Sequence, residues 1–215
     1  MKSVIHITNE LTYKNYSISS IILYLRKKLQ KKKISSTIIT NKIEAKIISK
    51  SECKILKINY LHFFSYFSFL KKKKNSILFL HGIWSSIQIM TIIISIILQK
   101  KILIHPHGMF LKEALRDQNI LKYFVKRIFL LIIKFFIKKN FYFVSSTNKE
   151  MAQIKFFFPK TKSFKIWNPY PFKKFKINTK LKKKKNFVFF GRINQHKNIL
   201  LLINSFIAAK LGDDW

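Results

Sequence analysis

Short runs of apolar residues alternate along most of the chain with stretches in which apolar residues recur every three or four positions. The short runs are typical of buried strands, and the wider spacing is typical of helices with one apolar face. This pattern predicts strands over residues 3–7, 36–40, 53–58, 77–80, 101–105, 141–145 and 163–167. It predicts helices over residues 18–33, 86–98, 123–138 and 147–157. Alternating strands and helices favour an α/β domain with a parallel sheet that carries helices on both faces.

The pattern changes after the last of these strands. Residues 170–185 contain a proline and a run of lysines with little periodicity, which is typical of a linker. The sequence after the linker holds one apolar strand, 187–190, and a helix whose apolar residues repeat at helical spacing, 199–206. The chain therefore divides into a first domain over residues 1–169, this linker, and the start of a second domain over residues 186–215.

The predicted strand–glycine–helix unit of the second domain is the most informative local feature. Gly191 stands where the chain has to turn sharply or approach a ligand closely. Arg192 and Lys197 lie near the start of the following helix, whose free N–H groups already favour an anion. The unit predicts a site for a phosphate or diphosphate, with the alternative that both cations are simply solvated.

The chain is strongly basic, because 43 lysines and arginines stand against 8 aspartates and glutamates, for a net charge of +35. Only four of these cations are arginine, the side chain that suits bidentate contacts to phosphate and guanine. We therefore expect no specific nucleic-acid partner. An AT-rich coding sequence explains a surplus of Lys, Ile, Asn and Phe without any binding role, and contact with an anionic membrane surface is the other explanation.

Several features bear on the cellular compartment. A single cysteine, Cys53, excludes an internal disulfide framework and fits a reducing compartment. The first residues lack the apolar core of a signal peptide. The uncharged run over residues 83–99 contains Ser, Thr and Gln and is short for a membrane span, so we expect a buried helix there. Residues 127–139 are typical of a basic amphipathic helix that lies on a membrane. We expect a cytoplasmic protein with peripheral contact to the inner face of an anionic membrane.

Histidines follow two of the predicted strands. His81 ends one strand, and the segment 105–108 (HPHG) ends the next. Ligands of parallel α/β sheets sit beyond the carboxyl ends of the strands, so His81, His107, Gly108 and Ser145 are candidates for a cleft. His107 suits a polar contact or a base, or else a structural hydrogen bond. No carboxylate or cysteine lies nearby in sequence and the spacing is not diagnostic, so we expect no metal site.

Ser145 also begins a stretch with helix-capping character. Ser146 or Thr147 is placed to cap the helix that follows, and Glu150 stands where a capping box requires an acid. Ser145 and Glu150 are thus candidates either for the cleft or for helix capping alone.

Several short motifs occur in an order that resembles the retaining glycosyltransferases of the GT-B fold, family 4. The similarity covers roughly residues 77–215. It rests on five segments: LFLHGIWS, ILIHPHGMFLKEAL, VSSTNKE, IWNPY and FVFFGRINQHKNILLLINSF. Five segments in the family's order with fitting gaps make the similarity fairly specific.

The resemblance implies Rossmann-like domains and the transfer of a sugar from a nucleotide-sugar to a glycan or lipid-linked acceptor in surface polysaccharide biosynthesis. It implies retention of the anomeric configuration and no metal cofactor. His107 matches the family's histidine that contacts the transferred sugar, and Gly191, Arg192 and Lys197 match positions that hold the donor diphosphate. The implied cleft or acceptor-side residues are His81, Gly108, Ser145 and Glu150.

The chain departs from the family pattern near both ends. The loop after the first strand holds Tyr13 and Lys14 where the family has glycines. The family's paired donor-domain glutamates would lie beyond Trp215. We therefore expect a truncated family member that carries only the first strand–helix unit of its second Rossmann-like domain, and no turnover by these 215 residues. The alternatives are an inactive remnant and a basic module that binds membranes or polyanions.

Overall fold

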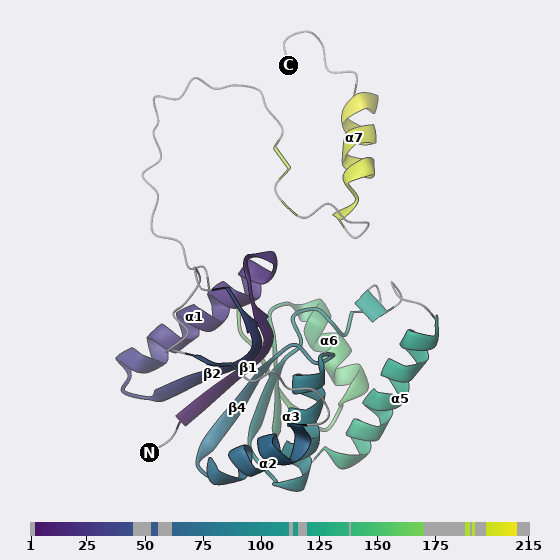
Figure 1. Cartoon of the computed structure of the whole chain (residues 1–215). Helices are drawn as coiled ribbons and strands as arrows, with labels where there is room; N and C mark the ends of the chain where they lie inside the picture. Colours follow the sequence, from purple (N-terminus) through teal and green to yellow (C-terminus); the bar gives the residue numbers. More distant parts are fainter. Residues whose placement is uncertain are drawn as a thin grey trace. The chain divides into compact units, whose positions relative to one another are not determined.

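The computed structural model describes residues 3–44, 53–55, 62–111, 114–115, 120–137, 139–169, 188–189, 191 and 197–209. The chain divides into two compact units, Met1–Pro171 and Phe172–Trp215 (Figure 1). Each unit is described by itself.

The first unit is built on one seven-stranded sheet in the order β3-β2-β1-β4-β5-β6-β7. Every neighbouring pair of strands is parallel. The strands are β1 (Ser3–Leu11), β2 (Ser35–Ile43), β3 (Cys53–Ile55), β4 (Ser76–His81), β5 (Ile102–His105), β6 (Phe141–Ser145) and β7 (Lys162–Lys165). The predicted α/β parallel sheet is therefore confirmed, and its order is compatible with a Rossmann-like fold.

Helices pack against the sheet (Figure 1) through two separate clusters of buried side chains. On one face, Ile22 of α1 (Tyr16–Lys31) packs with Leu11 and Ile38 of the strands. A second and larger core forms where apolar strand residues, such as Leu78 of β4 and Phe143 of β6, pack against four other helices. These helices are α2 (Phe63–Lys72), α3 (Ser86–Ile97), α5 (Ile120–Phe136) and α6 (Asn148–Phe157).

The uncharged run over residues 83–99 contains α3, and most of this helix is buried in the larger core. Its polar side chains are satisfied locally, because the hydroxyls of Thr91 and Ser95 each donate to the carbonyl four residues earlier at 2.6 Å. The predicted buried helix is thus confirmed. No helix in the described ranges combines the length and the apolar character that a bilayer crossing needs.

The sequence prediction differs from the structure in a few places within the first unit. β6 has the predicted bounds, whereas β1 continues four residues further, to Leu11. The helix α2 was not predicted, because apolar residues occupy most of its positions and conceal the helical spacing. A short 3-10 helix, η1 (Tyr13–Asn15), joins β1 to α1 in the loop that lacks glycine.

In the second unit, the predicted helix is present as α7 (Ile199–Ala208), and none of its residues is buried. The predicted strand over residues 187–190 is not formed at Val188 and Phe189, the two of its residues that are described. A strand needs a neighbour for its N–H and C=O groups, and none is described beside these residues. The predicted linker, 170–185, lies outside the described residues.

Candidate functional site

Four histidines come together at the carboxyl edge of the sheet. His6 lies inside β1, His81 ends β4, His105 ends β5, and His107 follows in the loop. The strand pairing places His81 directly beside His105. Successive strands are added on one side of β1 up to β3 and on its other side from β4 onward, so the switch point of the sheet lies between β1 and β4. Ligands of such sheets bind at the switch point. We call these four residues the histidine cluster.

The rings of the histidine cluster contact one another in series. His6 Nδ1 lies 3.0 Å from His81 Nε2, and His81 Nδ1 lies 3.3 Å from His107 Nε2. The rings of His105 and His107 stack with their centres 3.8 Å apart. Nε2 of His6 and Nε2 of His105 are buried and have no hydrogen-bond partner among the described residues. Two buried ring nitrogens are therefore left to be satisfied by something else.

Burial keeps the histidine cluster neutral. Burial lowers the pKa of His6 to about 4. Burial, with the charge of His105 as a second cause, lowers the pKa of His107 to about 3. Burial lowers the pKa of His81 well below its ordinary value, and the other three rings add to this effect. Burial also lowers the pKa of His105, against an opposing effect of the Glu150 carboxylate. At neutral pH each ring thus offers one donor and one acceptor.

Two glycines let the loops turn beside the histidine cluster. Gly82 has φ +98° and Gly108 has φ +80°, which favour glycine. A Cβ on Gly82 would also come within 2.6 Å of the Gln88 amide nitrogen. That amide donates to the carbonyl of His81, so the end of β4 is fixed by the first turn of α3. His107 itself is left-handed, with φ +53°.

Glu150 ties the loop after β5 to the start of α6. Its buried carboxylate accepts the N–H of Gly108 at 2.6 Å. It also accepts the N–H of Ser146 at 2.8 Å and the hydroxyl of the same serine at 3.1 Å. Thr147 caps α6 by accepting the N–H of Glu150 at 3.1 Å. Capping by Thr147 is thus confirmed, while the Glu150 carboxylate fixes the loop that carries His107.

A hollow of about 180 Å³ opens at this edge of the sheet. Polar residues from the end of β1, the start of α1 and the start of α3 line much of it, together with His81. Within it, the side chain of Asn15 donates to the carboxylate of Glu10. Tyr13, in the glycine-free loop, is half exposed. The hollow therefore has polar groups beside a mostly apolar lining, and it lies at the switch point of the sheet.

The structure brings together most of the residues that the sequence singled out in the first domain. His81, His107, Gly108 and Glu150 share this edge with Ser145, whose buried hydroxyl has no partner among the described residues. In the second unit, Gly191 and Lys197 are exposed. Arg192 lies outside the described residues.

His6 and His105 were not predicted as site residues. His6 is enclosed by apolar neighbours in sequence, so its own segment indicates only a strand. The sequence signal that could have identified His6 is its place between two apolar residues, Ile5 and Ile7. In the structure both isoleucines are buried in the larger core, and His6 contacts Phe79 and His81. A polar residue inside an apolar strand points to a polar neighbour on the adjacent strand.

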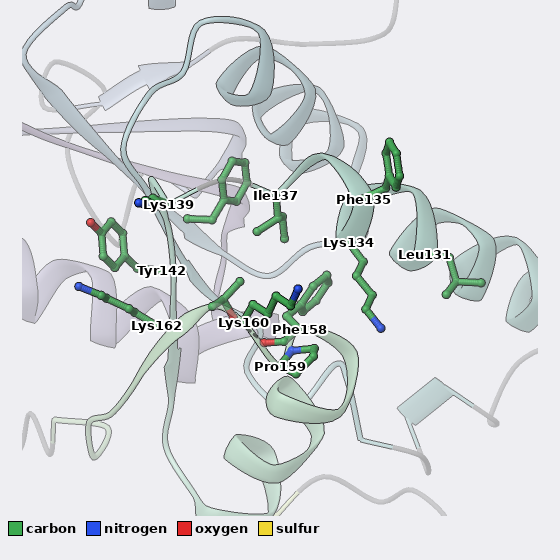
Figure 2. Close-up of a pocket in the computed structure, with 12 residues that line it drawn as sticks. Leu131, Lys134, Phe135, Ile137, Lys139, Tyr142, Phe158, Pro159, Lys160 and Lys162 are labelled. Carbon is green, nitrogen blue, oxygen red and sulfur yellow. Dashed lines mark hydrogen bonds between the residues drawn. The ribbon is translucent and has the colours of Figure 1, made fainter.

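A second, larger hollow of about 1020 Å³ lies at the opposite edge, where strands begin (Figure 2). It is lined by the end of α5, the first residues of β6 and the loop before β7. Four lysines line it beside apolar side chains: Lys134, Lys139, Lys160 and Lys162. Figure 2 shows the Lys134 side chain reaching from α5 toward Phe158 and Pro159.

Comparisons of the chain with protein-family models, with curated proteins and with solved structures found no match.

Proposed function

We propose that the first unit is the acceptor-side domain of a retaining GT-B glycosyltransferase and that the second unit begins its nucleotide-sugar domain. The reaction is transfer of a sugar from a nucleotide-sugar to a glycan or lipid-linked acceptor. Two observations support this proposal. The five sequence segments follow the order of that family, and a hollow lined in part by polar residues lies beside His81 at the carboxyl edge of the sheet.

The state of His107 is the observation that carries the proposal. The residue is partly exposed, its ring contacts His81, and its loop is fixed through Gly108 and Glu150. Its low pKa, caused by burial, keeps the ring neutral at physiological pH. A neutral, positioned imidazole can donate to or accept from a sugar hydroxyl without bringing a charge into the cleft.

On the donor side, the proposal assigns the diphosphate to Gly191, Arg192 and Lys197. Lys197 comes two residues before α7, and Asn198 between them is left-handed with φ 48°. The first N–H groups of a helix favour an anion. Cations there offset the charge that develops on the leaving nucleotide. No metal ion is required for this role.

We also propose a peripheral contact between α5 and an anionic membrane. Only Leu130 and Ile133 of this helix are buried. Its exposed large apolar residues are Ile120, Leu121, Phe124, Val125, Ile128, Leu131, Ile132, Phe135 and Phe136. Its cations are Lys122, Lys126, Arg127 and Lys134. An apolar surface among cations suits a helix lying in the head-group region of anionic lipid, and the lysine-lined hollow adjoins the end of this helix.

The proposal is tested with the natural gene product, nucleotide-sugars and an extract of membrane glycolipids, by measuring release of the nucleotide. We expect His107→Ala to reduce transfer by about 100-fold or more, as for a positioned polar catalyst. His62→Ala, which changes an exposed histidine far from the cluster in sequence, is the matched control. The proposal is wrong if no nucleotide-sugar binds, or if both variants transfer at the rate of the parent.

A further inference from the structure

Three rings of the histidine cluster converge in a way that sugar binding does not need. One ring nitrogen from each of His81, His105 and His107 lies within 4.8 Å of the other two. The rings come from the ends of two neighbouring strands and the loop after them, and His81 and His105 are buried. A single polar contact to a sugar would use only His107.

The closest pair has the spacing of two ligands on one ion. His81 Nδ1 and His107 Nε2 are 3.3 Å apart. Zinc binds imidazole nitrogen at about 2.0–2.1 Å, and two corners of a tetrahedron with such bonds are about 3.3–3.4 Å apart. The remaining separations, up to 4.8 Å, exceed that value by roughly 1.4 Å, so a ring has to shift by about an ångström. The side chain of His107 is partly exposed, so its ring can shift while Glu150 holds the backbone of the loop at Gly108.

The residues that contact the three proposed ligands also favour metal binding. A ligating histidine usually donates its other ring N–H to an acceptor, which fixes the tautomer. When His81 Nδ1 is a ligand, its Nε2–H faces Nδ1 of His6 at 3.0 Å, and His6 becomes that acceptor. The buried Nε2 of His105, which has no partner among the described residues, is left to act as a ligand. Glu150 contributes a buried negative charge that acts on His105.

We propose that His81, His105 and His107 form a binding site for one divalent transition-metal ion of the zinc class, with His6 orienting His81. Imidazole ligands suit Zn²⁺, Co²⁺, Ni²⁺ and Cu²⁺ and do not suit Mg²⁺ or Ca²⁺. Three protein ligands leave a fourth coordination position open to water or to a hydroxyl group. The ion occupies Nε2 of His107, so metal binding competes with any contact that this nitrogen makes to a sugar.

Binding of Co²⁺ and Zn²⁺ to the full chain tests this site. The protein carries a purification tag without histidine and is stripped with a chelator. Co²⁺ is then titrated while the visible absorption of tetrahedral Co²⁺ is recorded, and Zn²⁺ is used to displace it. The compared proteins are the parent, His107→Gln, His105→Gln and the matched control His62→Gln. Thermal unfolding of each protein without metal shows that the variant is folded.

We expect one tetrahedral Co²⁺ per parent chain, displaced by one Zn²⁺, and no effect of Mg²⁺. Loss of an outer partner typically weakens metal binding about 10–100-fold, so loss of a direct ligand in His107→Gln should cost at least tenfold. His107→Gln keeps the buried rings in place and is the informative variant if His105→Gln fails to fold. The site is refuted if the parent binds no Co²⁺, or if His107→Gln and His62→Gln bind it as the parent does. The measurement uses no sugar and no nucleotide, so its result is independent of the proposed transferase function.

Discussion

The two edges of the sheet in the first unit differ in how their polar groups are held. At the carboxyl edge, neutral histidines and one glutamate are buried, and hydrogen bonds link His6 to His81 and the N–H of Gly108 to Glu150. At the amino edge, lysines line two large hollows, of about 1020 and 730 Å³, beside apolar side chains. The hollow described at the carboxyl edge is smaller, about 180 Å³.

This difference indicates that the carboxyl edge holds its polar groups in a defined geometry, whereas the amino edge is mainly a charged surface. Burying polar groups costs free energy unless each finds a partner, so a buried cluster is retained only where its geometry is needed. The lysines that line the amino-edge hollows are exposed and specify little geometry, except Lys100, which is buried and donates to the carbonyl of Lys73 at 2.6 Å. The carboxyl edge is therefore the candidate for chemistry, and the amino edge with α5 is the candidate for adhesion to an anionic surface.

The largest expected effect is the pH dependence of stability. The histidine cluster has its pKa values lowered in the folded state, to about 4 for His6 and about 3 for His107, whereas unfolded histidine titrates near 6.5. Between these values the unfolded chain binds more protons, so the stabilisation present above about pH 6.5 is lost as pH falls. Each such histidine contributes about 1.4 kcal/mol per pH unit.

Urea unfolding of metal-free protein at several values between pH 7.5 and pH 4.5 measures this slope. His62→Gln should keep the slope of the parent, since His62 lies outside the cluster. A free energy of unfolding that is constant over this range would contradict the buried, neutral state of the cluster.

Removing the Glu150 carboxylate should have the next largest effect. Glu150→Ala leaves the N–H groups of Gly108 and Ser146 without their acceptor. Hydrogen bonds to charged groups contribute about 1.5–3 kcal/mol each, so we expect a loss of about 3 kcal/mol in the free energy of unfolding. The matched control is Glu44→Ala, which removes a solvent-exposed acceptor for the N–H of Tyr13. Equal losses in the two variants by urea unfolding would refute the role given to Glu150.

Two glycine substitutions at the carboxyl edge distinguish the cost of backbone strain from the cost of a steric clash. Gly82→Ala and Gly108→Ala both place an L-residue at positive φ, which costs roughly 1–2 kcal/mol. Only Gly82→Ala also puts a Cβ within 2.6 Å of Gln88, whereas the Cβ of Gly108→Ala meets nothing closer than 3.6 Å. We therefore expect Gly82→Ala to be the more destabilising variant in thermal unfolding. The reverse order would show that Gln88 does not fix the end of β4 as described.

The smallest effect concerns the amino edge and α5. Phe135→Ser removes an apolar side chain that is 85% exposed, so stability should be unchanged. Burying a phenylalanine in lipid contributes about 1.5–3 kcal/mol, so binding to phosphatidylserine vesicles should weaken about tenfold or more. Phe64→Ser on α2, where the side chain is 83% exposed, is the matched control. If both variants sediment with vesicles equally well, α5 is not the membrane contact.

The sequence predicted the strands of the first unit and their parallel sheet because local apolar spacing indicates both. The bounds of β6 and the burial of α3 were predicted in this way. The meeting of His6 with His81 was not predictable, because it depends on which strands become neighbours. Local periodicity does not specify strand order.

The role of Glu150 shows the same limit. Its position predicted helix capping, but its carboxylate accepts from Gly108, 42 residues away in the chain. The sequence placed His81 and the segment 105–108 at strand ends, but it did not predict that a ring nitrogen from each of His81, His105 and His107 comes within 4.8 Å of the other two. The spacing of these histidines in the sequence does not show that they are close in space, because their proximity depends on the pairing of β4 with β5.

The most direct test of the account is a long-range ¹H–¹⁵N NMR spectrum of the histidine rings, recorded from pH 7.5 to pH 5. This spectrum shows whether the histidines at the carboxyl edge form a linked cluster of neutral imidazoles. We expect the ring nitrogens of His6, His81 and His107 to keep the chemical shifts of neutral imidazole at pH 5, with His6 and His81 each in one tautomer. Titration of these rings near the ordinary pKa of 6.5, or rapid exchange between tautomers, would contradict it.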